Sequence, residues 1–143
     1  MITEDLQFIT CRWQQHNNEL KQIRSRVFIE EQQVPTELEW DEFDEQCIHF
    51  LVLYQDQAIA TARLKPDGQI GRMAVLREFR ERGVGTKLLS AVLLHASNNG
   101  YNMVYLHAQK QAIDFYNKFE FITNGKEFMD AGILHQAMYK TFV

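Results

Sequence analysis

The chain has 143 residues, of which 45% are hydrophobic, 12% aromatic and 24% charged, and its formal net charge at pH 7 is −4. This length suits one domain over 1–143, and the apolar content is enough for a packed core, which excludes a mainly disordered chain. A net negative charge argues against general nucleic-acid binding. No membrane-spanning run or secretion signal is recognised, so we expect a cytoplasmic protein in which Cys11 and Cys47 are reduced core thiols.

Apolar residues recur with strand and helix periods in turn along the chain. Alternation predicts a first strand over 6–13, and Asn17 and Asn18 are expected to cap a helix that continues to Phe28 and ends at Pro35. The acidic stretch over 36–45 is expected to be a loop or a short helix. After it the pattern predicts strands over 47–54, 58–64, 69–75 and 103–108, helices over 83–97 and 111–119, and closing strands over 121–123 and 135–142. These elements predict one domain of mixed α/β class.

Charge is distributed unevenly along the sequence. Nine of the nineteen acidic residues fall within 27–62, which contains no Lys or Arg, whereas 63–87 holds seven basic residues against three acidic ones. One interpretation is a cleft with a basic part for a polyanion and an acidic part for a cation. The other is that both segments are solvated surface. The sequence alone leaves both open.

The strongest chemical signal is the segment from Arg80 to Thr86, at the start of the helix expected over 83–97. Gly83 and Gly85 leave backbone N–H groups uncrowded by side chains, and the positive end of the helix dipole favours an anion there. Arg80, Arg82 and the Thr86 hydroxyl add donors, so the segment suits a pyrophosphate. A glycine that merely begins a helix is the alternative. A nucleotide-binding domain is disfavoured, because Lys87 does not follow a Gly-x-x-x-x-Gly run.

The spacing Arg80-x-x-Gly83-x-Gly85 resembles the Arg/Gln-x-x-Gly-x-Gly/Ala signature of the GNAT acyl-CoA N-acyltransferase superfamily. The preceding strand and the later Ala112-x-x-Phe115-Tyr116-x-Lys118 fall where that family places them. Segments 27–35, 41–44, 61–64, 106–109 and 128–138 are similar to its small bacterial ElaA/YjcF-like branch. The resemblance covers essentially the whole chain.

The resemblance implies an α+β fold in which a sheet of about seven mostly antiparallel strands is splayed between strands four and five and flanked by about four helices. Pantetheine is expected to lie in this wedge like an added strand, and an N–H of Ala74 or Val75 is expected to polarise the thioester carbonyl. Acetyl-CoA is thus the implied co-substrate. Its expected binding residues are Met73, Ala74, Val75, Arg80, Glu81, Arg82, Gly83, Val84, Gly85, Thr86, Phe115 and Lys118.

The implied reaction is direct acetyl transfer to a primary amine, either a small cationic molecule or a protein amine. Tyr116 is the expected proton donor to the leaving thiolate. Because an alkyl amine has a pKa near ~10, it must lose a proton, and Glu30, Glu31 and His107 are the leading base candidates, with His49 as another. For each of these four an ordinary structural role is equally open.

Other function classes are weighed on the same residues. A CoA-binding sensor or interaction domain without useful catalysis is the alternative to an enzyme. The acidic stretch over 37–45 favours a cationic acceptor, unless it is only solvated surface. Histidine spacing gives no metal site, so no metal is expected, and neither a nucleic acid nor a membrane is an expected partner. The closing strands leave room for a homodimer by strand pairing.

Two positions depart from the family pattern. Glu120-Phe121 stands where the family usually has Gly-Phe, so Glu120 is expected either to adopt a positive φ or to change the turn, which makes the placement of Lys118 uncertain. Gln109 stands where many members carry Asn, which leaves one cofactor contact open.

Overall fold

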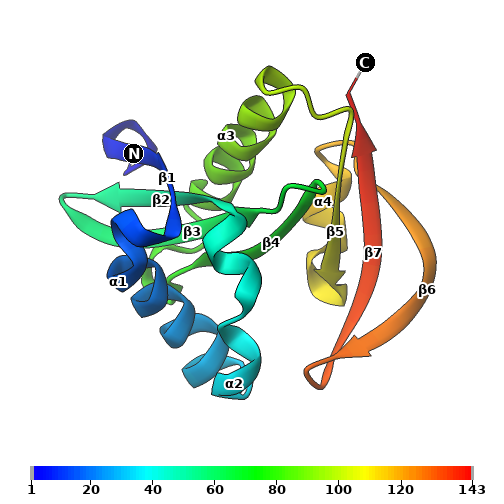
Figure 1. Cartoon of the computed structure of the whole chain (residues 1–143), viewed down its shortest axis with the longest axis horizontal. Helices are drawn as coiled ribbons and strands as arrows, with labels where there is room; N and C mark the ends of the chain where they lie inside the picture. Colours follow the sequence, from blue (N-terminus) through cyan, green and yellow to red (C-terminus); the bar gives the residue numbers. More distant parts are fainter. Residues whose placement is uncertain (1, 143) are drawn as a thin grey trace.

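A seven-stranded sheet with the order β1-β2-β3-β4-β5-β7-β6 forms the centre of the protein, in a computed structural model that describes residues 2–142 (Figure 1). Neighbouring strands are antiparallel except β4 and β5, which are parallel. The strands are β1 (Leu6–Cys11), β2 (Ile48–Tyr54), β3 (Gln57–Leu64), β4 (Gln69–Val75), β5 (Met103–Gln109), β6 (Ile122–Asp130) and β7 (Ile133–Thr141). The expected mixed sheet of about seven strands is confirmed.

Helices cover the two faces of the N-terminal half of this sheet (Figure 1). The α-helices are α1 (Trp13–Arg24), α2 (Thr36–Glu39), α3 (Val84–Asn98) and α4 (Ile113–Asn117); a π-helical segment, η2 (Ser25–Glu31), continues α1, and 3-10 segments are η1 (Ile2–Asp5), η3 (Glu42–Gln46), η4 (Arg77–Phe79) and η5 (Lys110–Ala112). Leu20 and Ile23 of α1 pack with Leu51 on one face. Leu88 and Val92 of α3 belong to the larger core on the other. None of the helices within 2–142 is long and apolar enough to span a bilayer.

Strands β4 and β5 pair over a short length and then separate. Their register contains only Gln69 with Tyr105 and Ile70 with Leu106. Beyond these pairs the two strands diverge, as Figure 1 shows, so the sheet is splayed where the family resemblance implied. The divergence exposes backbone and side chains of both strands to a common cleft.

A β-bulge marks β4 at the start of this divergence. Thr61 faces Ala74 and Arg63 faces Gly71, so Arg72 and Met73 together oppose the single residue Ala62 of β3. Arg72 has a φ of 49°, in the left-handed region that a non-glycine residue rarely adopts. The bulge therefore interrupts the regular ladder beside the cleft.

Three local expectations were wrong. Trp13 begins α1 instead of ending β1, and the helix is interrupted at His16 (φ −142°, ψ 29°), whose Nδ1 lies 2.6 Å from Oε2 of Glu19. Neither Asn17 nor Asn18 is therefore the helix cap. Strand β6 extends to Asp130 instead of ending near 123, because most of its side chains are exposed and give no apolar alternation to detect.

Candidate active site

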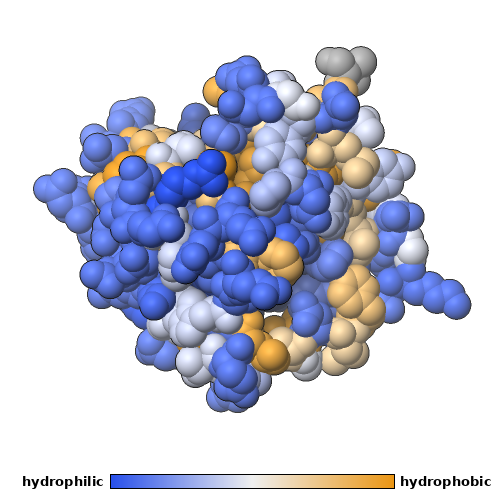
Figure 2. All heavy atoms as spheres, viewed as in Figure 1, coloured by the Kyte–Doolittle hydropathy of each residue, from blue (hydrophilic) through white to orange (hydrophobic). Residues whose placement is uncertain are grey.

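A cavity of ≈ 370 Å³ lies at the divergence of β4 and β5. Figure 2 shows the corresponding face hollowed between the α2 side and the β7 side, with apolar residues at its edge. One wall comes from η2 and α2, the floor from β4 and β5, and the other wall from the β6–β7 turn. The lining residues used below are Leu38, Glu39, Arg72, Met73, His107, Gln109, Tyr116, Asp130 and His135.

The glycine loop forms an open row of backbone donors at the N-terminus of α3. Gly83 precedes the helix with a φ of 84°, a conformation that favours glycine. Within the described chain, no backbone N–H from Glu81 to Thr86 has a hydrogen-bond acceptor. These free donors lie at the positive end of a 15-residue helix, so the loop fits a pyrophosphate group. Arg82 and Thr86 are exposed beside it.

Gly85 connects this loop to the cavity. A Cβ atom built on Gly85 would lie 3.7 Å from Cζ of Phe115 and 4.0 Å from Cε of Met73. Met73 in turn lines the cavity, and the Tyr116 hydroxyl donates a hydrogen bond to its Sδ atom at 3.7 Å. The anion cradle, Met73 and Tyr116 are thus contiguous. Lys118, by contrast, is exposed at the end of α4.

The Arg80 side chain is hydrogen-bonded to other residues of the protein, whereas the sequence suggested that it flanks a pyrophosphate. Its Nε donates to the Val75 carbonyl at 2.9 Å, and its Nη1 and Nη2 donate to the two carboxylate oxygens of Glu31 at 2.6 and 2.8 Å. The guanidinium therefore joins the end of β4 to η2. Its hydrogen bonds hold the pKa of Glu31 below the ordinary value, which makes Glu31 a poor proton acceptor at neutral pH.

Tyr116 lines the cavity and packs against aromatic neighbours. The Phe115 ring lies 5.1 Å away between centroids, and the Phe121 ring lies 5.9 Å away. Burial raises the pKa of Tyr116 to about 12. The hydroxyl is therefore protonated at neutral pH and can donate a proton or a hydrogen bond into the cavity.

Of the proposed bases, only His107 lines the cavity. His107 is exposed, but partial desolvation lowers the pKa of its imidazole, which is therefore neutral near pH 7 and can accept a proton. Glu30 is exposed and does not line the cavity. His49 is buried elsewhere, with Nε2 2.8 Å from the carbonyl oxygen of Asp44.

Sequence reasoning missed His135, which also lines the cavity. Its partner in the β5–β7 register is Gln109, two residues from His107, so the two histidines lie diagonally on neighbouring strands. The Phe128 ring contacts both imidazoles, at 5.1 Å from His107 and 5.9 Å from His135. Only knowledge of the β5–β7 pairing brings these residues together.

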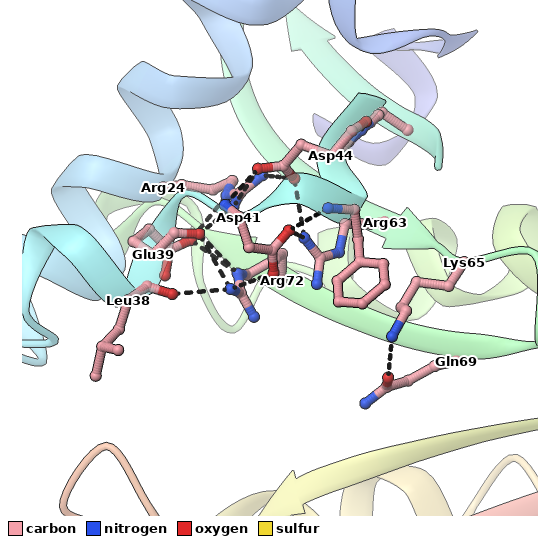
Figure 3. Close-up of polar contacts among 11 residues, drawn as sticks. Arg24, Leu38, Glu39, Asp41, Asp44, Arg63, Lys65, Gln69 and Arg72 are labelled. Atoms are coloured by element: carbon pink, nitrogen blue, oxygen red, sulfur yellow. Dashed lines mark hydrogen bonds and ion pairs between the residues drawn. The ribbon is translucent and has the colours of Figure 1, made fainter. Parts of the chain in front are cut away.

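The acidic stretch is bound by arginines from distant parts of the chain (Figure 3). Arg24 donates to Glu39 and to Asp44, each at 2.7 Å, and Arg63 donates to Asp41 at 2.7 Å and to Asp44 at 2.9 Å. Glu39 and Asp44 are both only 3% exposed at their side chains. The expectation that this stretch offers free carboxylates to a cationic acceptor, or is solvated surface, was wrong for these three acids.

Comparisons with known proteins agree with this architecture. The family model described as "Acetyltransferase (GNAT) domain" matches residues 13–142. YjcF of Bacillus subtilis, described as an uncharacterized N-acetyltransferase, is 35% identical over 122 residues that cover 82% of this chain and 87% of YjcF. ElaA of Escherichia coli is 32% identical over 132 residues, covering 87% of this chain and 86% of ElaA.

Solved structures of other proteins share this fold. The crystal structure of Escherichia coli ElaA superposes with a TM-score of 0.86 at 27% identity, covering 94% of this chain and 99% of ElaA. An acyl-CoA N-acyltransferase from Pseudomonas aeruginosa superposes with a TM-score of 0.87 at 25% identity, covering 95% of this chain and 99% of that one. Fold and sequence together define an acyltransferase. More specifically, the chain belongs to the GNAT acetyltransferase family, whose general activity is acyl-CoA-dependent N-acyl transfer.

Proposed function

We propose that the protein transfers an acetyl group from acetyl-CoA directly to a primary amine while both substrates are bound. The observation that carries this proposal is the contiguity of the glycine loop, Met73 and Tyr116 with a cavity that opens toward polar side chains. The donors of Glu81–Thr86 would hold the pyrophosphate, and the wedge between β4 and β5 would hold the pantetheine arm. The opposite end of the cavity would then admit the amine.

Tyr116 is the proposed proton donor to the departing CoA thiolate. A free thiol has a pKa near ~8.5, well below that of Tyr116, but burial also raises the pKa of a thiol. In this chain burial raises the pKa of Cys11 to about 11. A thiolate buried in the wedge would therefore come close to Tyr116 in proton affinity, which favours sharing and transfer of the phenolic proton.

The bulge in β4 is the proposed source of the donor to the carbonyl oxygen of the thioester. Ala74 and Val75 remain in register with β3, whereas Arg72 and Met73 do not. An amide released from the ladder beside the cleft can point at charge that develops during transfer. Val75, expected from sequence, offers a second such amide, because the N–H of the next residue, Leu76, donates to the Ile59 carbonyl of β3 and strand alternation directs the Val75 N–H to the cleft side.

His107 is the proposed acceptor of the amine proton, directly or through a water molecule. It lines the cavity, which Glu30 and Glu31 do not, and its lowered pKa makes the imidazole neutral near pH 7. A neutral imidazole can take one proton as the nitrogen forms its new bond to the acetyl carbon.

Thiol release from acetyl-CoA in the presence of a panel of primary amines tests the proposal. We expect Tyr116→Phe to lower turnover about 10- to 1,000-fold with nearly unchanged acetyl-CoA affinity, because only the proton is lost. Tyr101→Phe is the matched control, since Tyr101 does not line the cavity, and its turnover should equal that of the wild type. Equal turnover of Tyr116→Phe would remove Tyr116 from the mechanism. Acetyl-CoA binding without thiol release for any amine would favour a sensor.

A further inference from the structure

Arg72 faces the cavity from the acceptor side. Its Nη2 donates to the backbone carbonyls of Leu38 and Glu39 at 3.2 and 3.0 Å and to Oδ2 of Asp41 at 3.1 Å. Its Nε lies 3.2 Å from Oε2 of Glu39. These contacts fix the guanidinium against α2, while the adjacent Met73 points to the cofactor side. Arg72 and Met73, the two residues of the bulge, thus line the same cavity with different contacts, Arg72 against α2 and Met73 against Tyr116.

One nitrogen of Arg72 remains available. Within residues 2–142, Nη1 of Arg72 has no hydrogen-bond acceptor, although the side chain is only 25% exposed and lines the cavity. Figure 3 shows the Arg72 guanidinium at the lower edge of the ion-pair cluster, with one nitrogen that no dashed line reaches. A guanidinium has five N–H donors in a planar fork, so a second acceptor of suitable shape can still bind.

The surrounding cluster supplies no further carboxylate to this nitrogen. Arg24, Arg63 and Arg72 face Glu39, Asp41 and Asp44, and the three acids are already bound by these arginines. Nε of Arg63 is buried without any partner in the described chain, so donors exceed acceptors here. Burial, with Arg63 and Arg24 nearby, lowers the pKa of Arg72 in spite of Glu39 and Asp41. An added anion would supply a hydrogen-bond acceptor that this cluster lacks.

The other wall of the cavity has the opposite character. His107, Asp130 and His135 line it, and Asp130 has no ion-pair partner among the residues that the structure describes. A ligand with a negative group toward Arg72 and a protonated nitrogen toward Asp130 and His107 matches both walls. Tyr116 lines the same cavity and contacts Met73, the neighbour of Arg72 in the chain.

We propose that the acceptor is a small amino acid, and that Nη1 of Arg72 binds its free carboxylate while its amine is directed to the thioester. This inference rests on the proposed function and names its substrate class. It reverses the charge preference that the acidic stretch suggested, because the carboxylates of that stretch are bound and an arginine nitrogen is free. Arg72 is then a residue that determines specificity.

Matched pairs of acceptors test the inference without altering the protein. Free amino acids are compared with their carboxamides in the thiol-release assay with acetyl-CoA. Removal of the carboxylate lowers the pKa of the amine and so supplies more of the reactive neutral form, which biases the assay against our expectation. We still expect kcat/KM to be about 10- to 100-fold higher for the amino acid, the range of a charge-assisted hydrogen bond.

Variants of Arg72 test whether this residue is the source of the preference for amino acids. Arg72→Gln should abolish or reverse the preference for the amino acid over its carboxamide, because the more readily deprotonated carboxamide amine is then no longer offset, and Arg72→Lys should retain part of the preference because a positive charge remains. Arg26→Gln is the control, since Arg26 pairs with Glu78 at the surface and does not line the cavity. Acetyl-CoA affinity, measured for every variant, identifies any that has lost its fold.

The outcomes separate the inference from the proposed function. Equal or better use of carboxamides and simple amines would overturn the carboxylate site while leaving acetyl transfer intact. A preference for amino acids that persists in a folded Arg72→Gln variant would also overturn it. Acetyl-CoA binding with no thiol release for any amine, with or without a carboxylate, would defeat both proposals.

Discussion

Replacement of Asp44 by Asn tests the energetic role of the buried ion-pair cluster. Asp44 is 3% exposed and accepts hydrogen bonds from Arg24 at 2.7 Å and from Arg63 at 2.9 Å. Removal of one partner from a buried ion pair typically costs about 3–5 kcal/mol, because a charge is left uncompensated. Arg24 keeps Glu39 and Arg63 keeps Asp41 as partners. We therefore expect the loss in free energy of unfolding to lie at the lower end of this range, at about 3 kcal/mol.

Chemical denaturation of Asp44→Asn and the wild type measures this loss. The free energy of unfolding should fall by about 3 kcal/mol with an unchanged denaturant dependence. Glu127→Gln is the control, because Glu127 pairs with Lys110 at the surface, and it should unfold like the wild type. A loss below about 1 kcal/mol would refute the reasoning, since the cluster would then be no stronger than a surface ion pair.

The pH dependence of the same difference has a definite sign. Burial by itself would raise the pKa of Asp44, but hydrogen bonds and charges from Arg24 and Arg63 outweigh it and hold the pKa below its ordinary value of 3.8. The folded state therefore favours the ionised carboxylate. The advantage of the wild type over Asp44→Asn should be complete above pH 3.8 and should be lost as the pH falls below that value.

Three further predictions concern the glycine loop, the turn after α4 and the cysteines. Gly83→Val should weaken acetyl-CoA binding at least about tenfold, whereas Gly100→Val, at the same φ of 84° but in open space, should leave calorimetric affinity unchanged; equal affinities would refute the loop assignment. Glu120→Gly should raise the free energy of unfolding by about 0.5–1 kcal/mol, because Glu120 has a φ of 68°, and a loss of stability would contradict this. Cys11 and Cys47, whose pKa burial raises to about 11, should react with a thiol reagent only after unfolding, and rapid labelling of the native protein would oppose it.

Local sequence signals were sufficient to predict much of the fold. The strand over Gln69–Val75 and the helix that follows Gly83 lie where periodicity and glycine placed them. The positive φ expected for Glu120 is also observed. Errors occur where local patterns are weak: the exposed strand β6 has no apolar alternation, and α1 starts at Trp13 without a favoured capping residue.

The site was less predictable, because its polar contacts join distant parts of the chain. Glu31 and Arg80 are 49 residues apart, and Arg24 and Asp44 are 20 apart. A sequence scan counts these as free acids and free bases, although folding pairs them. Only the register of the sheet brings His135 close to His107. The charge pattern therefore located the charged segments of the chain. It could not show which of their side chains are paired in the fold and which remain available to a ligand.

Calorimetric titration of the wild-type protein with acetyl-CoA, CoA and ATP tests the central claim most directly. If the donors of Glu81–Thr86 and the wedge beside Met73 hold acetyl-CoA, both CoA forms should bind with micromolar affinity, and ATP, which has no pantetheine arm, should not bind measurably. Absence of CoA binding to the folded protein would contradict the claim, and the glycine pair would then be no more than the start of a helix.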